Sequence, residues 1–127
     1  MKIFQLLCAG ALALVVTVAS AGEVKKYDQA TFDALAAADK PVVLVVHATW
    51  CPTCKAQDPI QRGLMKSEPF KDYTMLTLDF DADKAILKTF RVSQQSTMIV
   101  FRGKTEVGRS VGDTTKAGIE ALMKKAS

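Results

Sequence analysis

The apolar residues of this chain occur in short runs that are separated by amphipathic stretches. Val42 to Val46 form an unbroken apolar run, which is typical of a strand that is covered on both faces of a sheet. Leu76, Leu78 and Phe80 alternate with polar residues, which is typical of a strand with one buried face. These patterns and the turn residues between them predict strands near residues 24–27, 42–46, 76–80, 97–101 and 106–111.

Helical spacing of apolar residues predicts helices that begin near Asp28, Cys51, Ile86 and Asp113. Pro59 lies inside the second of them and is expected to kink it, because proline lacks a backbone donor and clashes with the preceding turn. After the short first strand, the elements follow one another as α, β, α, β, α, β, β, α. This order predicts an α/β fold in which a central mixed sheet is flanked by helices on both faces.

The start of the chain has the pattern of an export signal. Lys2 precedes an almost unbroken stretch of apolar and small residues, and Ala19-Ser20-Ala21 fits a cleavage site. We therefore expect residues 1–21 to be a signal peptide and residues 22–127 to form one domain in the periplasm. The alternative is a retained membrane anchor that holds the domain on the periplasmic side, because the apolar stretch is near the roughly 20 residues that a spanning helix needs.

The charge balance is mild. The chain carries 17 Lys and Arg and 13 Asp and Glu residues, a formal net charge of +4. Only Lys2 would leave with the signal, so the mature net charge is one lower. The basic residues are scattered, with Lys25-Lys26 and Lys124-Lys125 as the only basic pairs. We therefore expect no binding to nucleic acid.

The residues 50–55, Trp-Cys-Pro-Thr-Cys-Lys, form the motif that carries chemistry, and they lie between a strand and a helix. A sulfur at the first turn of a helix faces unpaired backbone N–H groups and the positive end of the helix dipole, which both favour the thiolate. Cys51 is therefore expected to be nucleophilic. Cys54 follows almost one turn later, close enough to attack a mixed disulfide at Cys51. Pro52 fits the first helical position, where its missing N–H costs no intrahelical bond.

A C-x-x-C pair is also found in zinc sites and in inert structural disulfides. A tetrahedral zinc site usually needs four ligands, whereas the chain has only Cys8, Cys51, Cys54 and His47, and Cys8 belongs to the expected signal peptide. One alternative is a metal or iron–sulfur module in which two chains each donate Cys51 and Cys54. Another is a peptide-binding domain whose disulfide only staples the fold.

These features together resemble the thioredoxin family over the whole of residues 22–127. The positions that match the family pattern are, in chain order, Ala48, Trp50, Cys51, Cys54, Lys55, Pro59, Asp81, Thr97, Phe101 and Gly112. The resemblance implies a thioredoxin fold and thiol–disulfide exchange, with Cys51 as the nucleophile and Cys54 as the resolving thiol. It implies no cofactor and no metal.

The resemblance also bears on partners and on the direction of electron flow. Protein thiols and disulfides are the expected substrates, and an exported protein of this kind needs a membrane-bound redox partner. Reduction or isomerisation is favoured over net oxidation, because the sequence has no recognisable inserted helical domain such as dedicated periplasmic oxidases carry. We expect a monomer.

The chain departs from the family pattern at Ser96, where related proteins have a cis-proline that faces the two cysteines. A cis bond before a residue other than proline costs about 2.5–4 kcal/mol, so the bond from Gln95 to Ser96 is expected to be trans. The loop is then reshaped beside the sulfurs, with the Ser96 hydroxyl near Cys51. We expect Gln95, Ser96, Thr97 and Gly112 to contact the substrate.

A second departure is Val45, which stands where thioredoxins often bury an aspartate that helps the resolving cysteine to lose its proton. Asp58, four residues after Cys54, is a candidate substitute, and the alternative is an ordinary solvated carboxylate. His47 could favour the thiolate of Cys51, or could be only a packed ring. The residues that we expect to tune the redox chemistry are His47, Trp50, Pro52, Thr53, Lys55 and Asp58.

Overall fold

The structure is a computed structural model, and it describes residues 10, 11, 13, 14 and 21–127. Most of the expected signal peptide, including Cys8, lies outside the described residues. Among the helices that are described, none has the length and apolar character needed to cross a membrane.

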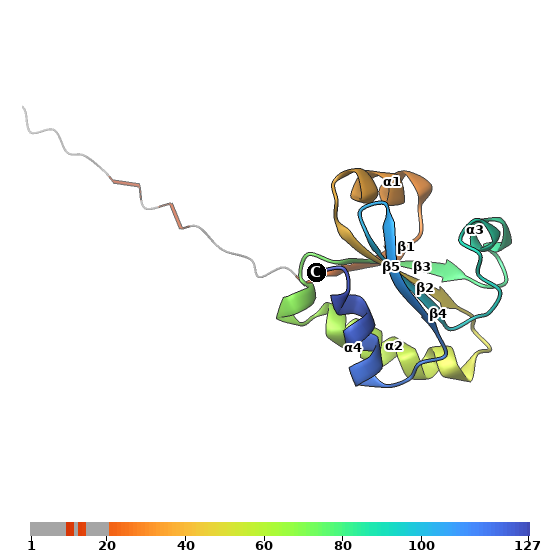
Figure 1. The fold of residues 1–127 in the computed structure, drawn as a ribbon. Helices are drawn as coiled ribbons and strands as arrows, with labels where there is room; N and C mark the ends of the chain where they lie inside the picture. The colour runs from red at the N-terminus through yellow and green to blue at the C-terminus, as the bar shows by residue number, and fades with distance from the viewer. Residues whose placement is uncertain (1–9, 12, 15–20) are drawn as a thin grey trace, which may run out of the picture.

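Strands and helices alternate along the described chain much as the sequence predicts (Figure 1). They are β1 (Glu23–Lys26), α1 (Gln29–Ala37), β2 (Pro41–His47), α2 (Pro52–Met65), β3 (Thr74–Asp79), α3 (Lys84–Thr89), β4 (Thr97–Arg102), β5 (Thr105–Val111) and α4 (Lys116–Lys124). A short 3₁₀ helix, η1 (Glu68–Phe70), was not predicted. Helix α2 continues through Pro59 to Met65 without ending.

The strands form one sheet in the order β1-β3-β2-β4-β5. Strand β3 pairs in parallel with β1 and β2, whereas β4 pairs antiparallel with β2 and β5. Helices α1 and α3 lie on one face of this sheet, and α2 and α4 lie on the other (Figure 1). The predicted α/β fold, with a mixed sheet between helices, is therefore confirmed.

Strand β2 lies in the middle of the sheet, and its side chains alternate between two hydrophobic cores. Val43 and Val45 pack with residues of α2 and α4, whereas Leu44 and Val46 pack with residues of α1 and α3. Leu44 and Val43 are completely buried. Full burial of one such side chain contributes about 1.5–3 kcal/mol, so the unbroken apolar run stabilises both layers at once.

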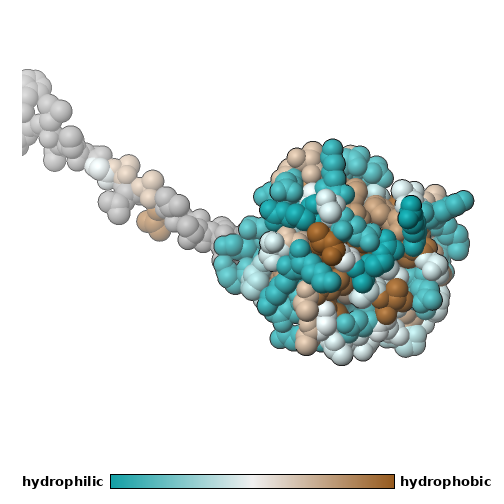
Figure 2. All heavy atoms as spheres, in the orientation of Figure 1, coloured by the Kyte–Doolittle hydropathy of each residue, from teal (hydrophilic) through white to brown (hydrophobic). Residues whose placement is uncertain are grey.

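The topology brings three connecting segments to one edge of the sheet. Strand β2 ends at His47 and leads through residues 48–51 into α2. Strand β4 runs antiparallel to β2, so its first residue, Thr97, lies near that end, and Thr97 pairs with Val111 at the end of β5. The cysteine motif, the segment before β4 and the segment after β5 therefore meet at the same place. Figure 2 shows one face of the surface, where hydrophilic residues predominate and apolar ones are scattered between them.

Candidate active site

The two cysteines lie at the beginning of α2 and form a disulfide with each other. Cys51 is the N-cap residue of the helix, and Pro52 follows at its first turn. The Cys51 sulfur accepts a hydrogen bond from the backbone N–H of Cys54, with a distance of 3.1 Å. The sulfur thus occupies the position that a capping oxygen usually takes, where backbone donors stabilise negative charge. The predicted place of Cys51 at the helix start is confirmed.

Both cysteines are nearly fully buried, with about 1% of each residue exposed. Cys51 and Cys54 pack with Ala48 and Phe80 in a small apolar cluster. The Cys54 sulfur lies 3.8 Å from the carbonyl oxygen of Val46. In this environment, negative charge on the Cys51 sulfur would be stabilised by the backbone N–H of Cys54 rather than by water.

Trp50 directly precedes Cys51 and contacts Phe80, which packs against this cluster. Its indole N–H donates to the carboxylate of Asp81 over 2.7 Å, and its ring meets the Phe80 ring edge to face with centroids 6.3 Å apart. The side chain is nevertheless half exposed, at 54% for the residue. Trp50 therefore fixes the segment just before Cys51 and leaves an apolar surface open beside it.

The segment before β4 contains the residue that replaces the family's cis-proline. No peptide bond in the described part of the chain is cis, so the predicted trans bond before Ser96 is confirmed. Ser96 has a left-handed backbone with a φ of 59°, which is uncommon for a residue other than glycine. Its N–H donates to the carbonyl oxygen of Val46 over 2.9 Å. That oxygen is the one beside the Cys54 sulfur, so the segment is anchored next to Cys54. Closeness of the Ser96 hydroxyl to Cys51 stays a prediction.

The other expected substrate-contacting residues share this edge. Thr97 is buried, and its hydroxyl donates to the carbonyl oxygen of Gln94 over 2.7 Å. Gly112 has a φ of 74° and donates its N–H to the Ser96 carbonyl oxygen over 3.0 Å. Gln95 is half-buried and lies between these anchored residues. Ser96 is anchored beside Cys54 through the Val46 carbonyl oxygen, and Gly112 is bonded to Ser96. The contacts of these residues with substrate stay a prediction.

The next segment, at the start of α4, is held by its own hydrogen bonds. The Asp113 carboxylate accepts bonds from the backbone N–H and the hydroxyl of Thr115, at 2.8 and 2.7 Å. These bonds, the backbone one first, hold the pKa of the Asp113 carboxyl below its ordinary value. The segment that follows Gly112 therefore carries a charged carboxylate at neutral pH.

Gln57 is a residue of the site that the sequence analysis missed. It lies on α2, three residues after Cys54, and only 2% of it is exposed. Its side-chain nitrogen donates to the carbonyl oxygens of Ser96 and Asp113, at 3.2 and 2.9 Å. The available signal was a polar residue at a position where an amphipathic helix should present an apolar one to the sheet.

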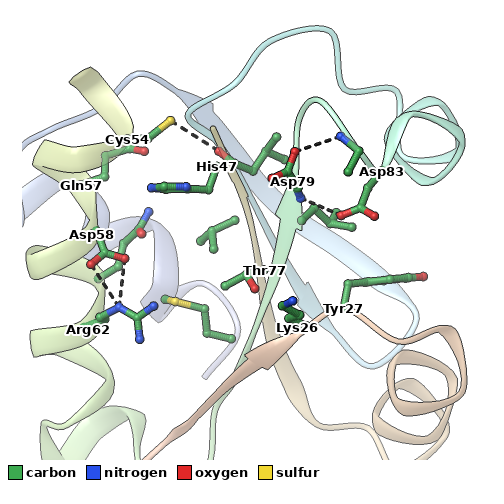
Figure 3. Close-up of a pocket in the computed structure, with 16 residues that line it drawn as sticks. Lys26, Tyr27, His47, Cys54, Gln57, Asp58, Arg62, Thr77, Asp79 and Asp83 are labelled. Atoms are coloured by element: carbon green, nitrogen blue, oxygen red, sulfur yellow. Dashed lines mark hydrogen bonds and ion pairs between the residues drawn. The ribbon is translucent and has the colours of Figure 1, made fainter. Parts of the chain in front are cut away.

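A cavity of about 400 Å³ lies between α2 and the sheet, and Cys54 is on its wall. Figure 3 shows Cys54, Asp58 and Arg62 along α2, while the His47 ring projects from the end of β2 toward that helix. Val45 also lines this cavity. The resemblance to the thioredoxin family led us to expect a buried carboxylate at this position, and Val45 supplies an apolar side chain instead.

The expected redox-tuning residues differ in how closely they approach the sulfurs. Asp58 shares the cavity with Cys54, but Arg62 holds its carboxylate through hydrogen bonds of 2.9 and 3.1 Å. Lys55 is exposed to solvent, and Thr53 is half-buried on the first turn of α2. Their effects on the sulfurs stay predictions.

Among the residues that the structure describes, no group of three or more His, Cys, Asp or Glu side chains is arranged to hold a metal ion.

A buried Cys-x-x-Cys disulfide at the N-terminus of a helix, on a mixed sheet with helices on both faces, defines a class of thiol–disulfide oxidoreductases. The thioredoxin family model matches residues 23–125, and the chain belongs to the thioredoxin family. It is 32% identical over 100 residues to a thioredoxin of Echinococcus granulosus, a match that covers 79% of this chain and 91% of that protein. The protein is thus a thiol–disulfide oxidoreductase with a Cys51–Cys54 pair.

Two further comparisons agree with this assignment. The chain is 34% identical over 92 residues to a bifunctional thioredoxin reductase/thioredoxin of Mycobacterium leprae, which covers 72% of this chain but 20% of that longer protein. A solved structure described as Trxlp from Edwardsiella tarda EIB202 superposes with a TM-score of 0.77 at 38% identity, covering 80% of this chain and 98% of the other. The fold is therefore the thioredoxin fold.

Proposed function

We propose that this protein is exported and exchanges disulfides with extracytoplasmic proteins through Cys51 and Cys54. The observation that carries the proposal is the Cys51 sulfur at the N-cap of α2, 3.1 Å from the backbone nitrogen of the residue that resolves its mixed disulfide. Backbone donors at this position stabilise a thiolate without any charged side chain. Cys51 is then the attacking sulfur, and Cys54 is the resolving one.

In the reducing direction, exchange takes two displacement steps. The Cys51 thiolate attacks one sulfur of a substrate disulfide, so the substrate S–S bond breaks and its other sulfur leaves as a thiolate that takes up a proton. Cys54 then loses its proton and attacks the Cys51 sulfur, which releases the second substrate thiol. The substrate gains two electrons, and the protein is left with the Cys51–Cys54 disulfide.

The pattern of residues 1–21 supports export of the mature domain to the periplasm. Disulfides persist in that compartment, so the substrates would be proteins with extracytoplasmic cysteines. Because cytoplasmic reductants cannot reach the domain there, a membrane-bound redox partner would return electrons to Cys51 and Cys54. One chain holds the complete pair, and we propose that it works as a monomer.

Reduction or isomerisation is the proposed direction of electron flow. The described residues 23–124 form a single thioredoxin domain, in which the connection from β3 to β4 contains only the short helix α3. Trp50 directly precedes Cys51, and Val111 pairs with Thr97 at the end of β5. They are 54% and 53% exposed, and these apolar side chains support docking of a polypeptide at this edge. Gln95, Ser96, Thr97 and Gly112 would contact this polypeptide.

The test is the midpoint potential of the Cys51–Cys54 pair in protein recovered from the periplasmic fraction of a bacterial host that expresses the full chain. The mass of the recovered protein is first determined by mass spectrometry, and we expect the mass of residues 22–127. The thiols are then counted after equilibration with glutathione or dithiothreitol buffers. A midpoint near about −270 mV supports a reductase, whereas one near about −120 mV would reverse the proposed direction.

Turnover is the control for this measurement. Cys54→Ser should trap a mixed disulfide between Cys51 and its substrates in the same fraction, and Cys51→Ser should trap none. A midpoint below about −300 mV with no trapped substrate would instead identify an inert structural disulfide. Protein that stays in the membrane fraction would support the anchored alternative.

A further inference from the structure

Gln57 links three parts of the chain that are far apart in sequence. It belongs to the same helix as the cysteines, and its two side-chain hydrogen bonds reach Ser96 before β4 and Asp113 after β5. Those two segments form the edge of the site, and Gly112 joins them a second time through its bond to the Ser96 oxygen. Gln57 thus couples the position of α2 to the positions of the segments at Ser96 and Asp113.

The hydrogen bonds of Gln57 are buried, which makes their loss costly. Gln57 and Ser96 are 2% and 5% exposed. If their hydrogen bond were lost, neither the Gln57 amide nor the Ser96 carbonyl oxygen could form a replacement bond to solvent water. A buried amide has two N–H donors, and both are used here. Removing the donors would leave the Asp113 carbonyl oxygen without its side-chain partner and the Ser96 carbonyl oxygen with only the Gly112 bond.

The backbone of Ser96 needs such support. Its left-handed conformation, with a φ of 59°, is unfavourable for a residue with a Cβ atom. Its N–H is bound to Val46, and its carbonyl oxygen is bound to Gly112 and Gln57. An uncommon backbone conformation persists only where surrounding contacts fix it, and Gln57 is the contact that comes from the helix of the cysteines.

We propose that Gln57 is a positioning residue, which holds the segments at Ser96 and Asp113 in register with Cys54 so that a polypeptide can dock beside the disulfide. The inference rests on the protein-substrate exchange proposed above. Gln57 does not touch the reacting sulfurs in this role; it fixes the surface against which the substrate backbone lies. A small dithiol needs no such surface, so its reaction with the disulfide should not depend on Gln57.

The test compares Gln57→Met with Gln61→Met. Gln61 lies one turn further along α2 and is also buried, and within the described part of the chain its side chain makes no hydrogen bond to either segment. Gln57→Met keeps a similar length and removes both donors. Kinetics are measured with insulin as the protein disulfide and with dithiothreitol as the small dithiol, and amide hydrogen exchange is followed by NMR.

For Gln57→Met we expect KM for insulin to rise about tenfold, while the rate with dithiothreitol stays within about twofold of the unsubstituted protein. The amides of Ser96 and Gly112 should exchange about tenfold faster, as expected for the loss of one buried hydrogen bond. Gln61→Met should change neither quantity. Gln57→Asn keeps the amide but shortens its reach, so it should fall between the two and can replace Gln57→Met if that variant does not fold.

Unchanged insulin kinetics and unchanged amide exchange in folded Gln57→Met or Gln57→Asn would overturn the proposal. Equal losses with insulin and dithiothreitol would also overturn it, because they would place Gln57 in the chemistry of the sulfurs. If the unsubstituted protein itself does not react with insulin, the proposed exchange with proteins fails. The amide exchange of Ser96 and Gly112 still tests the role of Gln57 in that case.

Discussion

Ser96 holds a backbone conformation that a proline could not adopt at the same place. Its φ of 59° is far from the value near −65° to which the proline ring is restricted. Its N–H also donates to the Val46 carbonyl oxygen, and proline has no N–H. The substitution of the family's cis-proline is therefore not a simple exchange of side chains, because the backbone around it follows another path.

The substitution Ser96→Pro should accordingly lower the free energy of unfolding by about 2 kcal/mol or more, because it removes a buried hydrogen bond and excludes the native φ. Ser96→Gly should be more stable than Ser96→Ala by about 1 kcal/mol, since glycine adopts the left-handed conformation without a Cβ penalty. Urea unfolding followed by circular dichroism measures both differences. A Ser96→Pro variant as stable as the parent would show that the backbone of this segment can change to a conformation that accommodates proline.

At the scale of single elements, helix α4 depends on the cap that begins it. Thr115 is the N-cap residue, and its hydroxyl oxygen accepts a hydrogen bond from the backbone N–H of Gly118 over 3.2 Å. The same hydroxyl donates to Asp113, which follows directly on Gly112 at the site. The cap therefore connects the stability of a helix to the position of a segment that borders the cysteines.

Thr115→Ala is expected to lower the free energy of unfolding by about 1 kcal/mol, the usual loss when a capping hydroxyl is removed. Thr114→Ala is the matched control, because Thr114 is exposed and is not the capping residue. Thermal unfolding at pH 7 should separate the two variants. Equal melting temperatures would show that the Thr115 hydroxyl is replaced by water at no cost.

At the scale of the whole molecule, the middle strand connects the hydrophobic core with the cavity behind Cys54. Val45 packs with residues of α2 and α4 and also lines that cavity, and 6% of it is exposed. An apolar residue here favours the stability of the domain but leaves Cys54 without a buried base. At position 45, an apolar side chain thus favours stability, whereas an acidic side chain would favour proton transfer from Cys54.

Val45→Asp should lower the free energy of unfolding by about 3 kcal/mol at pH 8, because it places an unpaired carboxylate in the core. Burial would raise the pKa of this carboxyl above its unfolded value of about 3.9. Below the pKa of the unfolded state the carboxyl is neutral in both states, so its charge costs no stability. As the pH rises from this pKa to the higher pKa of the folded state, the free energy of unfolding falls progressively. Chemical unfolding between pH 4 and 8 measures the trend.

Val45→Asn is the control for the charge, because it has nearly the same shape and does not titrate. Its stability should not acquire this pH dependence. The aspartate should also speed resolution of a mixed disulfide at Cys51 near neutral pH, since a positioned general base contributes about 10²-fold or more. A penalty in Val45→Asp that is equal at all pH values would show that water in the cavity solvates the carboxylate fully.

Local patterns in the sequence were sufficient to predict most of the fold. The apolar run at 42–46 marked the middle strand, and the cap at Asp28 and the motif at 50–55 marked two helix starts, which the structure confirms. The boundaries differ by a few residues, as for β1, which ends at Lys26 rather than at Tyr27. Helix caps, alternation and buried runs act over a few residues, so they can be read directly from neighbouring positions.

The sequence by itself determined the reactive pair, its place at a helix start and the trans bond before Ser96, because each depends on adjacent residues. Only the tertiary structure decided that Gln57 binds Ser96 and Asp113, 39 and 56 residues away. It also decided that Trp50 binds Asp81, 31 residues away. These contacts follow from the order of strands in the sheet, which brings distant segments to one edge, and no local pattern specifies that order.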